Sequence, residues 1–151
     1  MRFFTREWIN GELEDEAADT VVLAYRRHLE ALGLPNTIKK LAELNSHDGY
    51  VLDVELEASE NSLRIRLRCG DLQVGYFDAE LTFKNVKMSP TDLSTLAQAQ
   101  RSAGFEILYD EVDREAGAFM YRLLFQPAGE VSIRFSDVAI VRMPVTDRGC
   151  D

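Results

Sequence analysis

The chain is poor in residues that cross-link or catalyse. Its 151 residues include two cysteines, two histidines and one tryptophan, and no apolar run approaches the ~20 residues of a membrane span. Cys69 lies inside a strand pattern and Cys150 stands next to the last residue, so both indicate free thiols in a reducing cytosol. Charged and polar residues follow Phe4 at once, without the apolar core of a signal peptide. We therefore predict a cytoplasmic protein that does not enter a membrane.

Positive charge is scarce as well. The chain has 17 Lys and Arg against 26 Asp and Glu, which gives a net charge of −9. Nucleic-acid binding needs clustered cations that displace counterions from phosphates, so we expect no nucleic-acid partner. Residues 47–151 hold 18 of the acids against 11 Lys and Arg, a net charge of −7. An acidic surface of this kind suits a basic protein partner, and solubility is its simpler explanation.

Motifs of catalysis and cofactor binding are also missing. The sequence contains no Gly-x-Ser-x-Gly, no Walker-type loop and no His-Glu-x-x-His. Gly70 and Gly75 lie close together but lack the strand–loop–helix context of a phosphate-binding loop. We therefore expect no cofactor, no metal site and no catalytic residues, and we favour a non-enzymatic protein.

The first 46 residues predict helices. An apolar stripe at helical spacing runs through residues 12–32 and consists of Leu13, Ala17, Val21, Tyr25, Leu29 and Leu32. Gly33 and Pro35 end this helix, and a shorter one is predicted from about residue 36 to Leu44. The two helices are expected to form a hairpin that packs its apolar stripe on a sheet.

Residues 47–151 predict a largely antiparallel sheet. The stretch Tyr50–Val86 alternates apolar and polar residues with a period of two, on either side of a turn at residues 58–61. Three acids of the first strand should face three arginines of the second: Asp53, Glu55 and Glu57 opposite Arg64, Arg66 and Arg68. The alternation changes phase at residues 75–77, which predicts a bulge that bends the sheet.

The remaining sequence completes a single α+β domain over residues 1–151, with a helical part at 1–46 and a β-rich part at 47–151. A short helix follows the third strand, with Thr91 or Asp92 expected as its N-cap. Further strands are predicted at residues 105–112, 119–125 and 130–143. The expected fold is therefore an N-terminal helical hairpin packed on a six-stranded, largely antiparallel sheet, curved or closed into a barrel.

His47 and Asp48, in the loop before the first strand, are the strongest chemical candidates. A histidine beside a carboxylate can act as a base or a metal ligand. A metal site needs further ligands, however, and the other histidine, His28, falls inside the first long helix. A cap of the following strand is the simpler interpretation, and an acid–base enzyme using His47 and Asp48 is the weaker alternative.

Aromatic side chains suggest a second alternative, a small-molecule site in the mouth or cleft of the curved sheet. The sheet aromatics concerned are Tyr76, Phe83, Tyr109, Phe119 and Tyr121, and core filling is the simpler role for them. The complete set of candidate binding residues is His47, Asp48, Asp71, Tyr76, Asp78, Tyr109 and Tyr121.

Two further features have simple explanations. The acidic run Asp110–Glu115 could bind a hard cation, but its spacing does not match an EF-hand loop, and a solvated hairpin end is favoured. Cys69 falls on the inward phase of its strand, with no histidine nearby in sequence. It is expected to be a buried small hydrophobe rather than a nucleophile.

The opening Met1–Trp8, the acidic helix and the His47-Asp48 loop before paired strands resemble a group of small uncharacterised bacterial proteins, known as domain-of-unknown-function families. Some relatives with such a loop look like the immunity-type proteins found near bacterial toxin systems. The resemblance implies a bacterial cytosolic binding protein and supplies no catalytic residues. Our leading hypothesis is therefore a non-enzymatic interaction protein for a basic partner, with self-association as another form of partnership.

Overall fold

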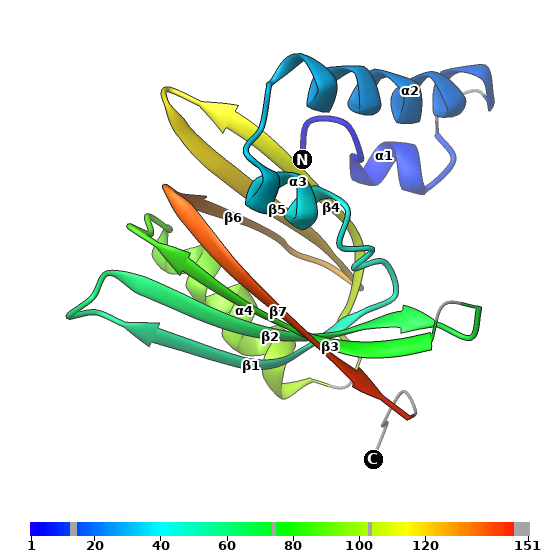
Figure 1. Cartoon of the computed structure of the whole chain (residues 1–151). Helices are drawn as coiled ribbons and strands as arrows, with labels where there is room; N and C mark the ends of the chain where they lie inside the picture. The colour runs from blue at the N-terminus through cyan, green and yellow to red at the C-terminus, as the bar shows by residue number, and fades with distance from the viewer. Residues whose placement is uncertain (13–14, 74, 103, 147–151) are drawn as a thin grey trace.

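Two antiparallel sheets and four helices make up the computed structural model, which describes residues 1–12, 15–73, 75–102 and 104–146 (Figure 1). The helices are α1 (Arg6–Ile9), α2 (Asp15–Ala31), α3 (Asn36–Ala42) and α4 (Pro90–Arg101). The first sheet has the order β1-β2-β3-β7 and is formed by β1 (Tyr50–Glu57), β2 (Ser62–Asp71), β3 (Gly75–Lys84) and β7 (Asp137–Val145). The second has the order β4-β5-β6 and is formed by β4 (Glu106–Glu115), β5 (Ala118–Gln126) and β6 (Glu130–Phe135).

The prediction of an α+β fold with antiparallel strands is confirmed, but the six-stranded layout and the closed barrel are wrong. The predicted last strand, 130–143, is two strands that belong to different sheets. Its inward residues change phase between Phe135 and Val138, and the chain crosses over at Ser136, whose amide donates to the Lys84 carbonyl. The described residues therefore form two open sheets.

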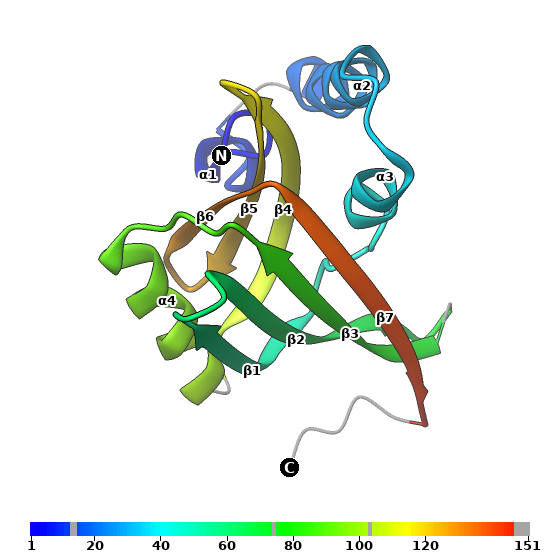
Figure 2. The ribbon, with the colours of Figure 1, turned by 60° about the vertical axis from the view of Figure 1, so that its left-hand side comes forward.

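The predicted helical hairpin on one sheet is also wrong. α3 packs against β7 and β4, which are edge strands of the two sheets (Figure 2). α2 lies apart from it, above the N-terminal segment, residues 1–5, and α1 (Figure 1). The physical reason is that the apolar residues of α2 meet the aromatic N-terminal segment: the Tyr25 ring lies 5.3 Å from Phe3 and 5.0 Å from Phe4. The side chains of Leu13 and Ala17 lie outside the described residues.

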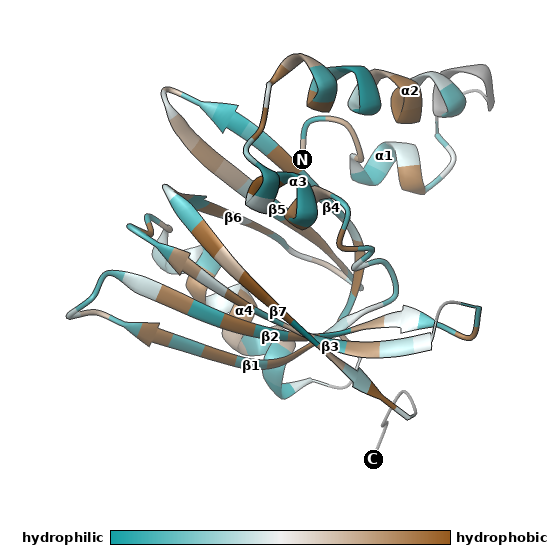
Figure 3. Cartoon of the chain, viewed as in Figure 1, coloured by the Kyte–Doolittle hydropathy of each residue, from teal (hydrophilic) through white to brown (hydrophobic). Residues whose placement is uncertain are grey.

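The main core lies between the facing sheets. Alternate residues of β2 and β6 point inward, so hydrophobic and hydrophilic positions follow one another along these strands (Figure 3). Phe83 of β3 stacks on Tyr121 of β5 with ring centroids 5.9 Å apart, and it meets Phe135 of β6 edge-on at 4.9 Å. α4 packs against β1 and β6 and buries Leu96 and Ala99 there. Its N-cap is Ser89, which forms a reciprocal capping box with Asp92, so the expected N-cap was two or three residues late.

The register of the first sheet differs from the prediction in two places. Asp53 faces Arg66 and Glu55 faces Arg64, but the third expected pair does not form, because the hairpin register places Glu57 opposite Ser62. A bulge lies between Val51 and Asp53, and beyond it Arg68 faces Tyr50. Arg68 instead pairs with Asp78 on β3. The bulge predicted at residues 75–77 is absent, and β2 and β3 pair without a shift through Gly70 and Tyr76. No described helix is long and apolar enough to cross a membrane.

Gly49, just before β1, links the first sheet to the second through a backbone hydrogen bond. Its carbonyl accepts from the Ile107 amide of β4, and a Cβ there would lie 2.7 Å from the backbone oxygens of Arg68 and Ser46. Gly49→Ala should therefore lower the free energy of unfolding by about 2 kcal/mol or more, measured by urea denaturation. Gly104→Ala is the matched control, since its Cβ would meet nothing within 4 Å, and equal losses would contradict the prediction.

Candidate functional site

A groove of about 620 Å³ opens between the helical part and the second sheet. It is walled by the N-terminal segment, α2, the residues after α3 and β4. Its lining consists of Phe4, Val22, Tyr25, Arg26, Leu29, Glu30, Ala42, Glu43, Asn45, Ser46, His47, Tyr109 and Asp110. The volume is within the range of about 300–1,000 Å³ that is usual for small-ligand sites.

The N-terminal wall is held by the buried carboxylate of Glu111. Its two oxygens accept from three successive backbone amides, those of Arg2 at 2.8 Å and of Phe3 and Phe4 at 2.6 Å each. Glu111 is 1% exposed, and the Arg122 guanidinium lies 4.0 Å from it. A buried charge is tolerated where hydrogen bonds and a counter-ion replace water. Glu111 therefore fixes the position of Phe4 in the groove.

The α2 wall is held by the next residues of β4. The Val112 amide donates to the Tyr25 hydroxyl at 2.8 Å, and the His28 ring bonds the Asp113 carboxylate at 2.7 Å. Burial acts to raise the pKa of Asp113, but hydrogen bonds from the Arg114 amide, His28 and Arg122 outweigh it, so this pKa is lowered. Asp113 therefore carries its charge at neutral pH.

The run Asp110–Glu115 is thus not the solvated hairpin end that we expected. Glu111 and Asp113 are 1% and 2% exposed, because the helical part covers this face of β4 and its amides, histidine and arginines replace water. In the part of the chain that is described, no three His, Cys, Asp or Glu side chains are grouped as a metal site.

Asp110 and Ser46 form the floor of the groove. The Ser46 hydroxyl donates to Asp110 Oδ1 at 2.6 Å, and Ser46 is fully buried. The hydroxyl of Tyr121 lies against both groups, but it makes no hydrogen bond of normal geometry to a described residue. Burial raises the pKa of Asp110 to about 6, against the opposing effect of the Ser46 hydroxyl, and Glu111 raises it further.

The structure brings some of the candidate residues together here. His47 and Tyr109 line the groove with ring centroids 4.9 Å apart, and Asp48 lies beside His47, 3.4 Å from its Nε2. The Nδ1 of His47 bonds the Leu108 carbonyl. Tyr121 belongs to the core beneath the floor, and it reaches this site through Asp110.

The other candidates do not line the groove. Asp71 ends β2 and accepts from the Gln73 amide at 2.7 Å, as a turn residue does. Tyr76 is half-buried on β3, and Asp78 is buried and paired with Arg68. Cys69 is buried as expected, and burial raises the pKa of its thiol to about 12, which keeps it protonated; Cys150 lies outside the described residues.

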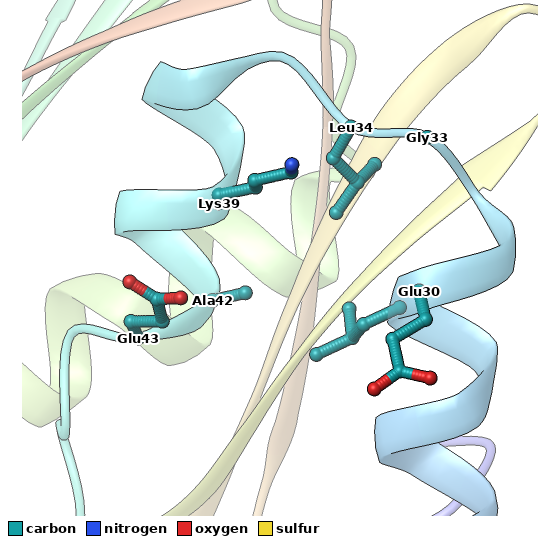
Figure 4. A pocket seen from close by; sticks show the side chains of 7 residues that line it. Glu30, Gly33, Leu34, Lys39, Ala42 and Glu43 are labelled. Atoms are coloured by element: carbon teal, nitrogen blue, oxygen red, sulfur yellow. The ribbon is translucent and has the colours of Figure 1, made fainter.

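A smaller pocket of about 370 Å³ separates α2 from α3 and borders the groove (Figure 4). Leu29, Glu30, Ala42 and Glu43 line both spaces, so the two are adjacent. Glu30 on α2 and Glu43 after α3 stand on either side of the gap, with Lys39 at the smaller pocket only (Figure 4). The rim of the groove is therefore acidic.

Sequence reasoning missed Ser46, Tyr25 and Asp110 as site residues. The alternation of β4 breaks at a bulge between Ile107 and Tyr109, so the inward side of Asp110 could not be derived from the period. The sequence did offer one signal of an unusual environment: carboxylates fall within a predicted strand whose apolar residues occupy both faces.

No family model, no curated protein and no solved structure matches this chain. The resemblance to small bacterial proteins therefore remains an expectation.

Glu111→Gln should detach the N-terminal wall, because an amide cannot accept from three backbone N–H groups as a carboxylate does. We expect unfolding free energy to fall by about 3 kcal/mol and Trp8 fluorescence to shift to the red, since this single tryptophan packs on Phe4 and Tyr109. Glu115→Gln is the control, because Glu115 pairs with Arg122 at a half-exposed site. A Trp8 emission spectrum unchanged by Glu111→Gln would refute this role of Glu111.

Asp110→Asn should stabilise the protein at pH 7.5 by about 2 kcal/mol, since it removes an incompletely compensated charge from a half-buried position. The folded-state pKa of about 6 exceeds the unfolded value, so the folded protein binds the Asp110 proton more tightly. The stability from this group is therefore full below about pH 4 and is lost as pH rises through about 6. Urea denaturation from pH 4 to 7.5 checks this, with the exposed Asp71→Asn as control; a gain independent of pH would contradict it.

Proposed function

We propose that this protein is a non-enzymatic binding protein that takes a basic group of a protein partner into the groove between α2 and β4. The single observation that carries the proposal is the composition of the groove: apolar and aromatic walls beneath an acidic rim and floor. Three carboxylates line it, those of Glu30, Glu43 and Asp110, against Arg26 and the ring of His47. Such a surface attracts a positive partner and seats its apolar side-chain stems.

The charge of the whole chain supports the same partner. A net charge of −9 steers cationic molecules toward the surface and repels anionic ones, which favours encounter with a basic protein over nucleic acid. An immunity-like role toward a basic toxin and a bacterial cytosolic location are the biological setting we propose. The buried, protonated Cys69 thiol fits a reducing compartment.

A non-enzymatic role is favoured by the hydrogen bonds of His47. Its Nδ1 is engaged by a backbone carbonyl and its Nε2 faces Asp48, so the ring is oriented by the loop as a cap would be. The second candidate function is a small-molecule binder that uses the same groove, and the volume of about 620 Å³ supports it.

The test measures the binding of a fluorescent basic peptide by fluorescence anisotropy, at low salt and at physiological salt. Charge reversal at the rim, Glu30→Lys with Glu43→Lys, should weaken binding about tenfold or more. The matched control is Glu57→Lys with Glu60→Lys, which makes the same change in net charge at exposed residues of the β1–β2 hairpin. Equal losses in the two double variants, or no binding by the wild type, would overturn the proposal.

A further inference from the structure

We propose that Asp110 is the cation subsite of this groove and that its ligand is an ammonium group on an apolar stem, as in a lysine side chain or a free alkylamine. The inference rests on the proposed function only in taking the groove as the binding site. It adds the residue, the chemical class of the ligand and a coupling to pH.

The first observation is that Asp110 has no cationic partner in the described part of the chain, whereas the buried carboxylates near it each have one. Asp78 pairs with Arg68, and Asp113 pairs with Arg122 at 3.3 Å and with His28 at 2.7 Å. Glu111 holds three amides and lies 4.0 Å from Arg122. Among the described residues, no Lys, Arg or His forms an ion pair with Asp110, whose side-chain partners are the neutral hydroxyls of Ser46 and Tyr121. Asp110 is half-buried at the groove, and a partly desolvated carboxylate without a counter-ion is stabilised by a cation that binds it.

The second evidence is the Tyr121 hydroxyl. It is fully buried, has no hydrogen-bond partner of normal geometry among the described residues and lies against Ser46 and Asp110 from below. The hydroxyl lowers the pKa of Asp110 and so favours its charged form, which is the form that attracts a cation. A cation above Asp110 would fix its carboxylate in the charged form, for which the Tyr121 hydroxyl is a ready donor.

The geometry favours an ammonium over a guanidinium. A guanidinium binds a carboxylate best through two parallel hydrogen bonds that use both oxygens. The Ser46 hydroxyl already occupies Asp110 Oδ1, and Ser46 is locked in place by burial. An ammonium is a compact charge that needs one oxygen, and it can use Asp110 without displacing Ser46.

The walls fit the stem of such a ligand. Between the floor and the acidic rim the groove is lined by Phe4, Val22, Tyr25, Leu29 and Tyr109, which offer apolar surface to methylene groups. Glu30 and Glu43 at the rim would attract the ligand, and Asp110 would hold its charge.

Binding should be coupled to protonation of Asp110, because the neutral acid does not attract an ammonium. The titratable or charged groups that face Asp110 or share its groove come from every surrounding element: Cys69, Tyr121, Glu111, Tyr25, Arg26, Glu30, Glu43, His47 and Tyr109. Of these, His47 is the one whose ordinary pKa also falls in the same window, so a variant must separate its effect.

The experiment titrates n-butylammonium, n-butylguanidinium and n-butanol into the full-length protein and follows them by NMR chemical shifts. We expect n-butylammonium to bind with the highest affinity, and its Kd to rise about tenfold between pH 7.5 and pH 5 as Asp110 is protonated. Asp110→Asn should weaken n-butylammonium about tenfold and abolish this pH dependence, whereas Asp71→Asn, the same substitution at an exposed turn, should change neither.

Three outcomes would overturn the subsite: equal affinity for n-butanol, tighter binding of n-butylguanidinium, or a pH dependence that survives in Asp110→Asn and so belongs to His47. A lysine-containing peptide in the same titration separates the sources of the amine. If the free amine binds at Asp110 but the peptide does not, the protein-partner proposal fails and the subsite stands. If the peptide binds equally to wild type and Asp110→Asn, the subsite fails and the partner proposal stands.

Discussion

The carboxylate of Glu111 is the interaction on which the arrangement of the helical part depends. Three consecutive amides of the N-terminal segment bind it, and Phe4, fixed in this way, contacts Tyr25 of α2 and Tyr109 of β4. One buried charge on a strand therefore organises an aromatic cluster that would otherwise lie exposed. Since water cannot reach Glu111, the amides are its main solvation, and their loss would leave an uncompensated charge.

The groove depends on carboxylates of the single strand β4, some of which have cationic partners and one of which has none within the described ranges. Glu111 and Asp113 attach the helical part, and Asp110, one position before them, faces the space that this attachment encloses. The carboxylates have two roles because Glu111 and Asp113 lie beside cations, whereas no described Lys, Arg or His forms an ion pair with Asp110.

Much of the architecture could be predicted from the sequence because it depends on local period. The alternation in Tyr50–Val86 gave the first three strands, and the helix after them was expected from its opening residues. The division into two sheets could not be predicted, since it depends on a phase change of one residue at Ser136 within an apolar run. His47 and Tyr109 were predicted as site residues from their chemistry. Asp110 and Ser46 were missed because a bulge and a long-range contact, not spacing, bring them together.

The floor of the groove and its α2 wall are attached to the sheet in different ways, and the bridge between Gly49 and Ile107 is the reason. Two backbone hydrogen bonds, Asp48 to Ile107 and Ile107 to Gly49, tie the His47 loop to β4, so the floor is attached to the sheet through the backbone. The described part of α2, in contrast, is attached through the side chains of Tyr25 and His28. A ligand would meet a pre-organised floor that costs little entropy to engage, and a wall that can adjust to its bulk. Selectivity for charge and tolerance for shape would then reside in separate parts of one site.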